Sequence, residues 1–273
     1  MKIAVTGGAG FIGRATIAAA EAAGHTAWPF DRHDGNDVLD DLSGLKPADC
    51  VIHLAGMLGT AELFDQAEEA VHANVIGTLR ILRWCADTGA SYVGITMPDS
   101  SWANVYQATK LCANRLATAW HLSRGVRVSH VRAFNAYGPG QKHGPGHPRK
   151  IIPAFAAEAY AGQPITIWGS GVQTVDLVHV DDVGRMLIAA TAFGDDEVFD
   201  AGTGVPRSVN RVAKYINTIV GNDAGVRYLP MRDGERPGTH IIARGAGWDL
   251  LDFSLRPTFD WGRLADVVES YRP

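Results

Sequence analysis

The sequence predicts an α/β protein with a doubly wound parallel sheet, followed by a smaller, mixed C-terminal lobe. Three features indicate this class. A β-branched run at the N-terminus ends in glycines, strand-like runs then alternate with helical segments, and shorter, mixed elements follow residue 135. With 273 residues, 46% of them apolar, the chain is long enough for one large domain and a smaller unit.

The first half of the chain is expected to alternate strands with helices. Strands are predicted at 2–6, 25–30, 50–55, 92–96 and 127–133, and helices at 11–23, 62–87 (broken near Asn74) and 104–123. After a loop rich in glycine and proline, helices are expected at 151–161 and 182–192, and strands at 165–168, 174–180 and 197–201. We therefore expect residues 1–135, with returning segments at about 174–200, to form the sheet domain. Residues 136–173 and 201–273 would form the smaller lobe.

Composition excludes several classes of function. The net charge of −4, with both signs scattered, argues against a nucleic-acid or anionic-membrane partner. No apolar run is long enough for a membrane span, and the N-terminus lacks the apolar stretch of a signal peptide. The three cysteines are widely spaced, which argues against a disulfide framework or a zinc site. We expect a cytoplasmic protein without a metal.

A glycine-rich turn joins the first strand to the first helix. In TGGAGFIG, Gly7, Gly10 and Gly13 have the spacing G-x-x-G-x-x-G, with Phe11 and Ile12 inside the motif. Glycine lets the backbone approach a pyrophosphate and lets the helix pack close to the strand, while the helix N-terminus offers free N–H groups. Because the turn follows a strand and opens a helix, it predicts a dinucleotide site rather than a plain tight turn.

An acidic residue ends the second predicted strand. Asp31 lies 18 residues after Gly13, where a carboxylate can accept hydrogen bonds from the adenosine ribose and repel a 2′-phosphate. This position favours NAD over NADP, although the neighbouring Arg32 could bind a 2′-phosphate. Asp37 and Val38 would contact the adenine or form a solvated turn.

A tyrosine and a lysine are spaced by four residues on the predicted helix 104–123. Tyr106 and Lys110 therefore share one helix face and can serve one site. A free phenol has a pKa near 10, and a nearby cation favours the phenolate. Such a pair can remove the proton of a sugar hydroxyl whose carbon gives up hydride.

These motifs occur together with VIHLAG (51–56), NVIGT (74–78), RAFNAYGPGQ (132–141) and VHVDDV (178–183). In this order they resemble the extended short-chain dehydrogenase/reductase family, most closely its nucleotide-sugar epimerase/dehydratase branch. The resemblance covers nearly the whole chain and implies a Rossmann-type fold, NAD as cofactor and a nucleotide-sugar substrate. It also implies a homodimer built from the helices at 62–87 and 104–123.

The resemblance implies particular roles for residues of this chain. Tyr106 would be the base, and Lys110 would hold the nicotinamide ribose and lower the phenol pKa. Thr96 would be the hydroxyl that contacts the substrate, with Ser100 and Ser101 as rivals. The cofactor contacts would be Gly7, Gly10, Phe11, Ile12, Gly13, Asp31, Asp37, Val38, Leu54, Ala55, Gly56, Asn74, Tyr106 and Lys110.

On the substrate side, the resemblance implies that Asn135 contacts the sugar nucleotide. Arg236 would hold its diphosphate, the alternative being a surface arginine, and His179 is expected to be a packed residue.

The chain departs from the family pattern at two positions. Dehydratases of this branch carry an Asp-Glu pair after the hydroxyl residue, whereas Thr96 is followed by Met97-Pro98. Valine stands at 175, where the family commonly has an arginine that holds a substrate phosphate. The basic loop 142–150 could be a phosphate clamp or a solvated lid. We expect an NAD-dependent 4-epimerase. The alternatives are a keto-sugar reductase or dehydrogenase, or a non-catalytic dinucleotide-sensing protein.

Overall fold

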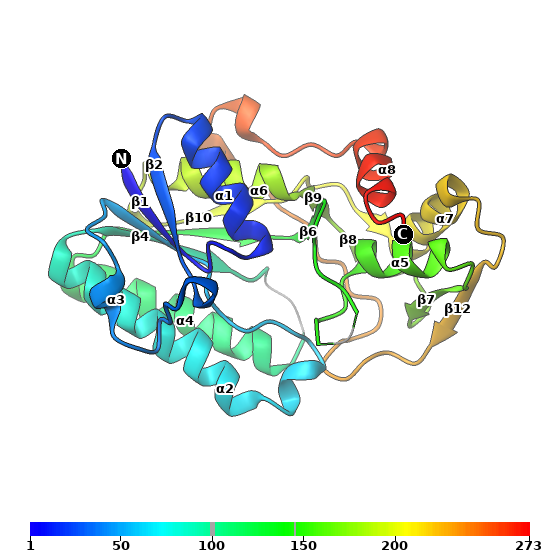
Figure 1. The fold of residues 1–273 in the computed structure, drawn as a ribbon, viewed down its shortest axis with the longest axis horizontal. Coiled ribbons are helices and arrows are strands. Elements are labelled where there is room, and N and C mark those ends of the chain that lie inside the picture. The colour runs from blue at the N-terminus through cyan, green and yellow to red at the C-terminus, as the bar shows by residue number, and fades with distance from the viewer. Residues whose placement is uncertain (99–101, 145) are drawn as a thin grey trace.

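A six-stranded parallel sheet forms the larger part of the molecule (Figure 1). The structure is a computed structural model, and it describes residues 1–98, 102–144 and 146–273. The strand order is β10-β5-β4-β3-β1-β2. The strands are β1 (Lys2–Thr6), β2 (Thr26–Phe30), β3 (Cys50–His53), β4 (Ser91–Thr96), β5 (Val128–Ala133) and β10 (Asp195–Ala201). The order reverses beside β1, which places a crevice at the carboxyl ends of β1 and β3.

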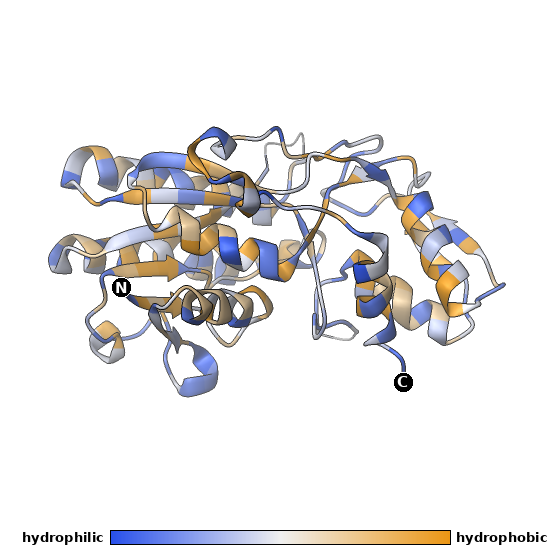
Figure 2. Cartoon of the chain, turned by 90° about the horizontal axis from the view of Figure 1, so that it is seen from above, coloured by the Kyte–Doolittle hydropathy of each residue, from blue (hydrophilic) through white to orange (hydrophobic). Residues whose placement is uncertain are grey.

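Helices cover both faces of this sheet. They are α1 (Phe11–Ala22), α2 (Ala67–Val71), α3 (Gly77–Thr88), α4 (Val105–Arg124) and α6 (Val180–Ala190). Helices α1 and α6 pack together on one face, and α3 and α4 lie on the other (Figure 1). The strands between them are apolar, as the orange strands in Figure 2 show, and each face has its own core. The expected break near Asn74 is a π-helical turn at His72–Ile76, between α2 and α3.

The C-terminal lobe is built around three helices and short strands. Its elements are β6 (Asn135–Tyr137), α5 (Ile151–Tyr160), β7 (Ile165–Trp168), β8 (Thr174–Val175), β9 (Leu177–His179), β11 (Arg207–Ser208), α7 (Val209–Val220), β12 (Val226–Leu229) and α8 (Trp261–Glu269). A separate apolar core joins α5, α7 and α8 to β7. The strands pair two by two, β6 with β9, β7 with β12 and β8 with β11.

The segment expected as one returning strand at 174–180 is divided at Asp176. Its two halves, β8 and β9, pair with β11 and β6, so only α6 and β10 reach the large sheet. The Asp176 carboxylate is fully buried and accepts hydrogen bonds from the backbone of Thr203, Gly204 and Ala243, and from the Thr203 hydroxyl. A buried carboxylate with four donors is well satisfied, and it fixes three segments at the junction of sheet and lobe.

None of the helices in the described ranges combines the length and the apolar character required to cross a membrane.

Candidate active site

A cavity of about 730 Å³ lies between the carboxyl ends of the sheet and the C-terminal lobe. Its walls come from the first half of the chain at one end and from the 142–177 and 231–241 segments at the other. The lining includes the residues for which the sequence predicts a catalytic, cofactor or substrate role, namely Gly7, Gly10, Phe11, Ile12, Gly13, Asp31, Asp37, Val38, Leu54, Ala55, Gly56, Asn74, Thr96, Tyr106, Lys110, Asn135 and Arg236. Residues separated by more than 200 positions therefore face one space.

The glycine turn forms a cradle that side chains would fill. Gly7 has φ +68°, and a Cβ there would lie 2.8 Å from Ala55 N. A Cβ on Gly13 would lie 2.3 Å from the carbonyl oxygen of Gly7. Helix α1 starts directly after Gly10 with neither a side-chain cap nor an acidic residue in its first turn. The free N–H groups and the bare backbone suit a pyrophosphate, so the cradle fits a dinucleotide.

The Asp31 carboxylate closes the outer side of this cradle. It accepts hydrogen bonds from the backbone N–H groups of Ala9 and His33, both at 3.0 Å. The neighbouring Arg32 forms an ion pair with Asp37, with 2.7 Å between Nε and Oδ2. Since a carboxylate already engages this guanidinium, the geometry supports NAD rather than a cofactor with a 2′-phosphate.

A chain of buried hydrogen bonds lies behind the cofactor wall. Thr6 Oγ1 accepts from Ala55 N and lies 2.7 Å from His53 Nδ1, while His53 Nε2 lies 3.1 Å from Thr78 Oγ1. Thr78 donates its own proton to the Asn74 carbonyl, so His53 is neutral, with its proton on Nε2. Burial, with the Lys110 charge adding to it, lowers the pKa of His53 to about 3.

The side chain of Asn74 is occupied within the protein. Its amide exchanges two hydrogen bonds with the backbone of Met57 and donates a third to Thr109 Oγ1. These contacts join the loop after β3 to the helix that carries Lys110. Asn74 also lines the cavity, and its contact with the cofactor stays a prediction.

Tyr106 and Lys110 lie on the first turns of α4 and both line the cavity. Burial raises the pKa of Tyr106 to about 12 and lowers the pKa of Lys110 to about 8. The predicted lowering of the phenol pKa by the lysine is therefore not seen in this structure. Desolvation disfavours the charged form of each group and accounts for both shifts. Lys110 remains mostly protonated at neutral pH, and the phenol is neutral.

The structure also places Thr96, Asn135 and His179. Thr96 is buried at the end of β4 and lines the cavity, whereas its rivals Ser100 and Ser101 lie outside the described residues. Asn135 begins β6 and also lines the cavity. His179 is buried and packs edge-on against Tyr137, as expected of a packed residue.

The lobe end of the cavity is rich in charged side chains that sequence reasoning did not single out individually. Two guanidinium groups lie over the Trp168 ring, those of Arg149 at 4.5 Å and Arg232 at 5.3 Å. Arg149 is paired with Glu158, and Arg232 with Glu235. Within the described part of the chain, Arg232 Nε is buried without a hydrogen-bond partner. An unsatisfied buried donor beside a cavity indicates a polar ligand.

Lys150 also belongs to this end and has no ion-pair partner among the described residues. Burial lowers its pKa, with Glu62 opposing the shift and Arg232 adding to it. Val175 lies on the same wall. The positively charged side chains near Val175, where the family commonly has an arginine, therefore come from other segments of the chain. The basic loop 142–150 was the sequence signal for Arg149 and Lys150, and no sequence signal indicated Arg232.

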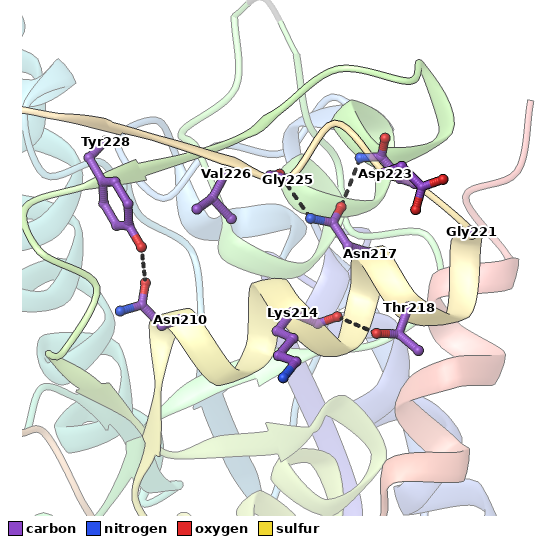
Figure 3. Close-up of a pocket in the computed structure, with 10 residues that line it drawn as sticks. Asn210, Lys214, Asn217, Thr218, Gly221, Asp223, Gly225, Val226 and Tyr228 are labelled. Carbon is purple, nitrogen blue, oxygen red and sulfur yellow. Dashed lines mark hydrogen bonds between the residues drawn. The ribbon is translucent and has the colours of Figure 1, made fainter.

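A second, more open hollow lies on the far side of the lobe, between α7 and β12 (Figure 3). Its amides bind each other and the backbone: Asn217 donates to Gly225 O and accepts from Asn222, and Asn210 accepts from Tyr228. These side chains stabilise the turn after α7, and the large cavity remains the candidate site.

The fold and the cavity define a class of protein, a dinucleotide-binding enzyme with a tyrosine–lysine pair at the carboxyl edge of its sheet. Comparison with known families specifies this class further. Residues 3–202 match the NAD dependent epimerase/dehydratase family, and the chain belongs to it. The family is enzymatic, and its cofactor is NAD.

Individual relatives share the same architecture with different activities. UDP-glucuronate 4-epimerase of Thermodesulfobacterium geofontis is 30% identical over 237 residues, which cover 78% of this chain and 72% of that protein. The dTDP-glucose 4,6-dehydratase of Streptomyces niveus is 27% identical, with 100% and 93% covered. The structure of MoeE5 in complex with UDP-glucose and NAD is 28% identical, with a TM-score of 0.85 and coverage of 100% and 99%.

Proposed function

We propose that this protein is an NAD-dependent epimerase that inverts C4 of a nucleoside-diphosphate sugar. The observation that carries the proposal is the position of Tyr106 and Lys110 in the same cavity as the glycine cradle, with no acidic pair after Thr96. A dehydratase needs an acid and a base to expel water from the sugar. Residues 97 and 98 are Met and Pro, which supply neither.

Each end of the cavity would hold one ligand. The glycine cradle and Asp31 would bind the adenosine and pyrophosphate of NAD, and Lys110 would hold its nicotinamide ribose. NAD, when bound, supplies the acceptor and donor of hydride at the sugar carbon. Arg236 and the cations Lys150 and Arg232 would bind the sugar diphosphate, with Asn135 between the two ends.

In this arrangement Tyr106 moves the proton. Its Oη would accept the proton of the C4 hydroxyl as that carbon is oxidised and return it after the sugar has turned over. The neutral phenol must first lose its own proton, and its pKa near 12 is unfavourable in the absence of ligands. With ligands bound, the Lys110 ammonium would favour the phenolate, and Thr96 would donate a hydrogen bond to the sugar oxygen.

The test is a panel of UDP-, dTDP- and GDP-sugars incubated with the purified protein and NAD, with products identified by NMR. We expect one sugar to give its C4 epimer with no net change in nicotinamide absorbance. Net reduction of NAD, or net consumption of NADH with a keto sugar, would instead identify an oxidoreductase of the same fold. If Tyr106→Phe left the biological activity unchanged, the protein would be a dinucleotide sensor.

We also propose that the protein is a homodimer joined through α2, α3 and α4. Apolar side chains on this side are exposed, including Val71, Ile76, Leu111 and Leu122. Large apolar side chains exposed on neighbouring helices are the kind of surface that a subunit interface would cover. Analytical ultracentrifugation at micromolar concentration should give the dimer mass. A monomer at every concentration would contradict the proposal.

A further inference from the structure

The loop that carries Arg236 is held against the segment just before Tyr106. This Arg236 loop comprises residues 231–239, after β12. Asn104 Nδ2 donates a hydrogen bond to Gly234 O at 3.1 Å, and Trp102 Nε1 donates to Thr239 Oγ1 at 3.0 Å. The Thr239 hydroxyl in turn donates to Arg236 O at 2.6 Å. The two contacts therefore lie on either side of Arg236 and reach its own backbone.

Asn104 makes contacts in two directions. Its Oδ1 accepts from Gln107 N at 2.9 Å and caps α4, the helix of Tyr106 and Lys110. Its Nδ2 holds the Arg236 loop, and the residue is 7% exposed. Aspartate and serine cap helices about as well as asparagine, but only the amide combines the cap with a donor for a backbone carbonyl in this geometry. The second contact therefore gives this position a role beyond helix capping.

The approach of the loop to α4 is close enough to require glycine. Gly234 has φ +77°, and a Cβ there would lie 2.7 Å from Asn104 Cβ and 3.1 Å from a ring carbon of Phe64. Any side chain at 234 would push the Arg236 loop away from the helix. The contact is thus formed by three separate features: an amide, an indole and a glycine.

We propose that Asn104 and Trp102 are positioning residues that fix the distance between Arg236 and Tyr106. The inference rests on the proposed function, in which Arg236 binds the diphosphate and Tyr106 faces the sugar. These two residues come from different lobes and are 130 positions apart in the chain. Because a small misplacement of a bound group costs much of the rate, a direct tie between the phosphate-binding loop and the catalytic helix keeps the sugar aligned with the phenol.

The first test distinguishes the contact of Asn104 with the Arg236 loop from its role as the cap of α4. Asn104→Asp keeps the cap acceptor and removes the donor to Gly234. We expect the KM for the nucleotide sugar to rise about three- to ten-fold, the effect of losing one hydrogen bond, and the melting temperature to fall by a few degrees, with the NAD dissociation constant unchanged. Asp233→Asn is the matched control, because Asp233 is exposed in the same loop and its side chain makes no hydrogen bond or ion pair with the described residues; it should leave KM unchanged.

A second pair of variants tests the indole contact. Trp102→Phe keeps an aromatic ring but removes the N–H, and Thr239→Val removes the hydroxyl that accepts from it. Thr239→Val also loses the bond to Arg236 O, so its KM should rise at least as much as that of Trp102→Phe. If Trp102 acts only through Thr239, the double variant should have about the same KM as Thr239→Val alone, and Thr239→Ser should have the wild-type value. Fully additive effects on KM would contradict the Trp102 contact.

Hydrogen–deuterium exchange tests the tie without turnover. In the NAD-loaded protein without sugar, peptides covering 231–239 should exchange faster in Asn104→Asp and Trp102→Phe than in the wild type or Asp233→Asn. Unchanged exchange and unchanged KM in both variants would overturn the inference. A wild-type protein that converts no nucleotide sugar would overturn the proposed function instead, while the exchange measurement would still decide on the tie.

Discussion

At the cofactor end of the cavity the groups that face the ligand are mainly backbone atoms, whereas at the lobe end they are charged side chains. The glycine cradle offers N–H groups and one carboxylate, Asp31, within a single β-α-β unit. The lobe end gathers Arg149, Lys150 and Arg232 from two segments, around one tryptophan. A site made of backbone atoms requires only a particular local chain conformation. A site made of charged side chains can be built from different residues as long as the total charge is kept. The difference predicts that variants at one end should affect one ligand only.

Loss of the phenol should have the largest effect, because it lies where the two ends meet. Tyr106→Phe should lower kcat by about 10³-fold, within the usual range for a general base, with NAD binding retained. Steady-state kinetics and calorimetry with NAD measure the two quantities. Tyr228→Phe, in the hollow between α7 and β12, is the control and should have full activity. A Tyr106→Phe enzyme with more than a tenth of the wild-type rate would contradict the role of the phenol.

The second residue of the pair, Lys110, should lower the stability of the folded protein. Lys110→Met removes a buried ammonium whose pKa is lowered from 10.5 to about 8, so the free energy of unfolding at pH 7 should rise by about 3 kcal/mol. The gain should be full below pH 8. Between pH 8 and 10.5 it should shrink, because the folded wild type then loses a proton that the unfolded chain keeps.

Urea unfolding of Lys110→Met and wild type at pH 7 and at several higher pH values measures this gain. Lys214→Met, at an exposed position, is the control and should be neutral. A Lys110→Met protein that is less stable than the wild type at pH 7 would show that the ammonium is compensated by partners.

A methyl group in the glycine cradle should affect the cofactor end alone. Gly13→Ala places a carbon 2.3 Å from Gly7 O, so the NAD affinity should fall by about 100-fold, the upper end of the cost of overpacking. Calorimetry with NAD measures this loss, and circular dichroism checks the fold. Gly262→Ala in α8 meets only the flexible Asp260 side chain at 3.0 Å and should bind NAD normally. Equal NAD affinities for both variants would exclude the cradle as the pyrophosphate site.

The converse variant should affect the lobe end alone. Arg236→Met removes a cation from the proposed diphosphate site, so the KM for the nucleotide sugar should rise by about 30-fold while the NAD affinity stays the same. The matched control is Arg211→Met, an exposed arginine on α7 outside the cavity. If Arg236→Met weakened NAD binding as much as sugar binding, the two ends would not be separate sites.

The residues predicted for the cofactor end line one cavity in the structure, and each part of this end is local in the sequence. The glycine turn, Asp31 and the tyrosine–lysine pair each lie within one short segment, and strand order alone brings them together. The lobe end depends on the pairing of β7 with β12 and β8 with β11, which joins residues 32 to 61 positions apart. No local pattern reveals such pairing, so the positions of Arg232 and Trp168 relative to Val175 could not be predicted.

Two errors have a similar cause. The strand expected at 174–180 is divided because the Asp176 carboxylate turns inward to four donors from distant segments. The pKa of Tyr106 is raised rather than lowered because of burial, a property of the whole fold that the spacing from Lys110 does not reveal. In both cases the environment of the side chain required the structure.

The most direct test of the proposed reaction follows a deuterium atom placed at C4 of the sugar that the enzyme converts. An enzyme that takes hydride from C4 and returns it to the other face of the same carbon should give an epimer that keeps its deuterium at C4. Product that has lost the label from C4, to another carbon, to the nicotinamide or to water, would contradict the epimerase account.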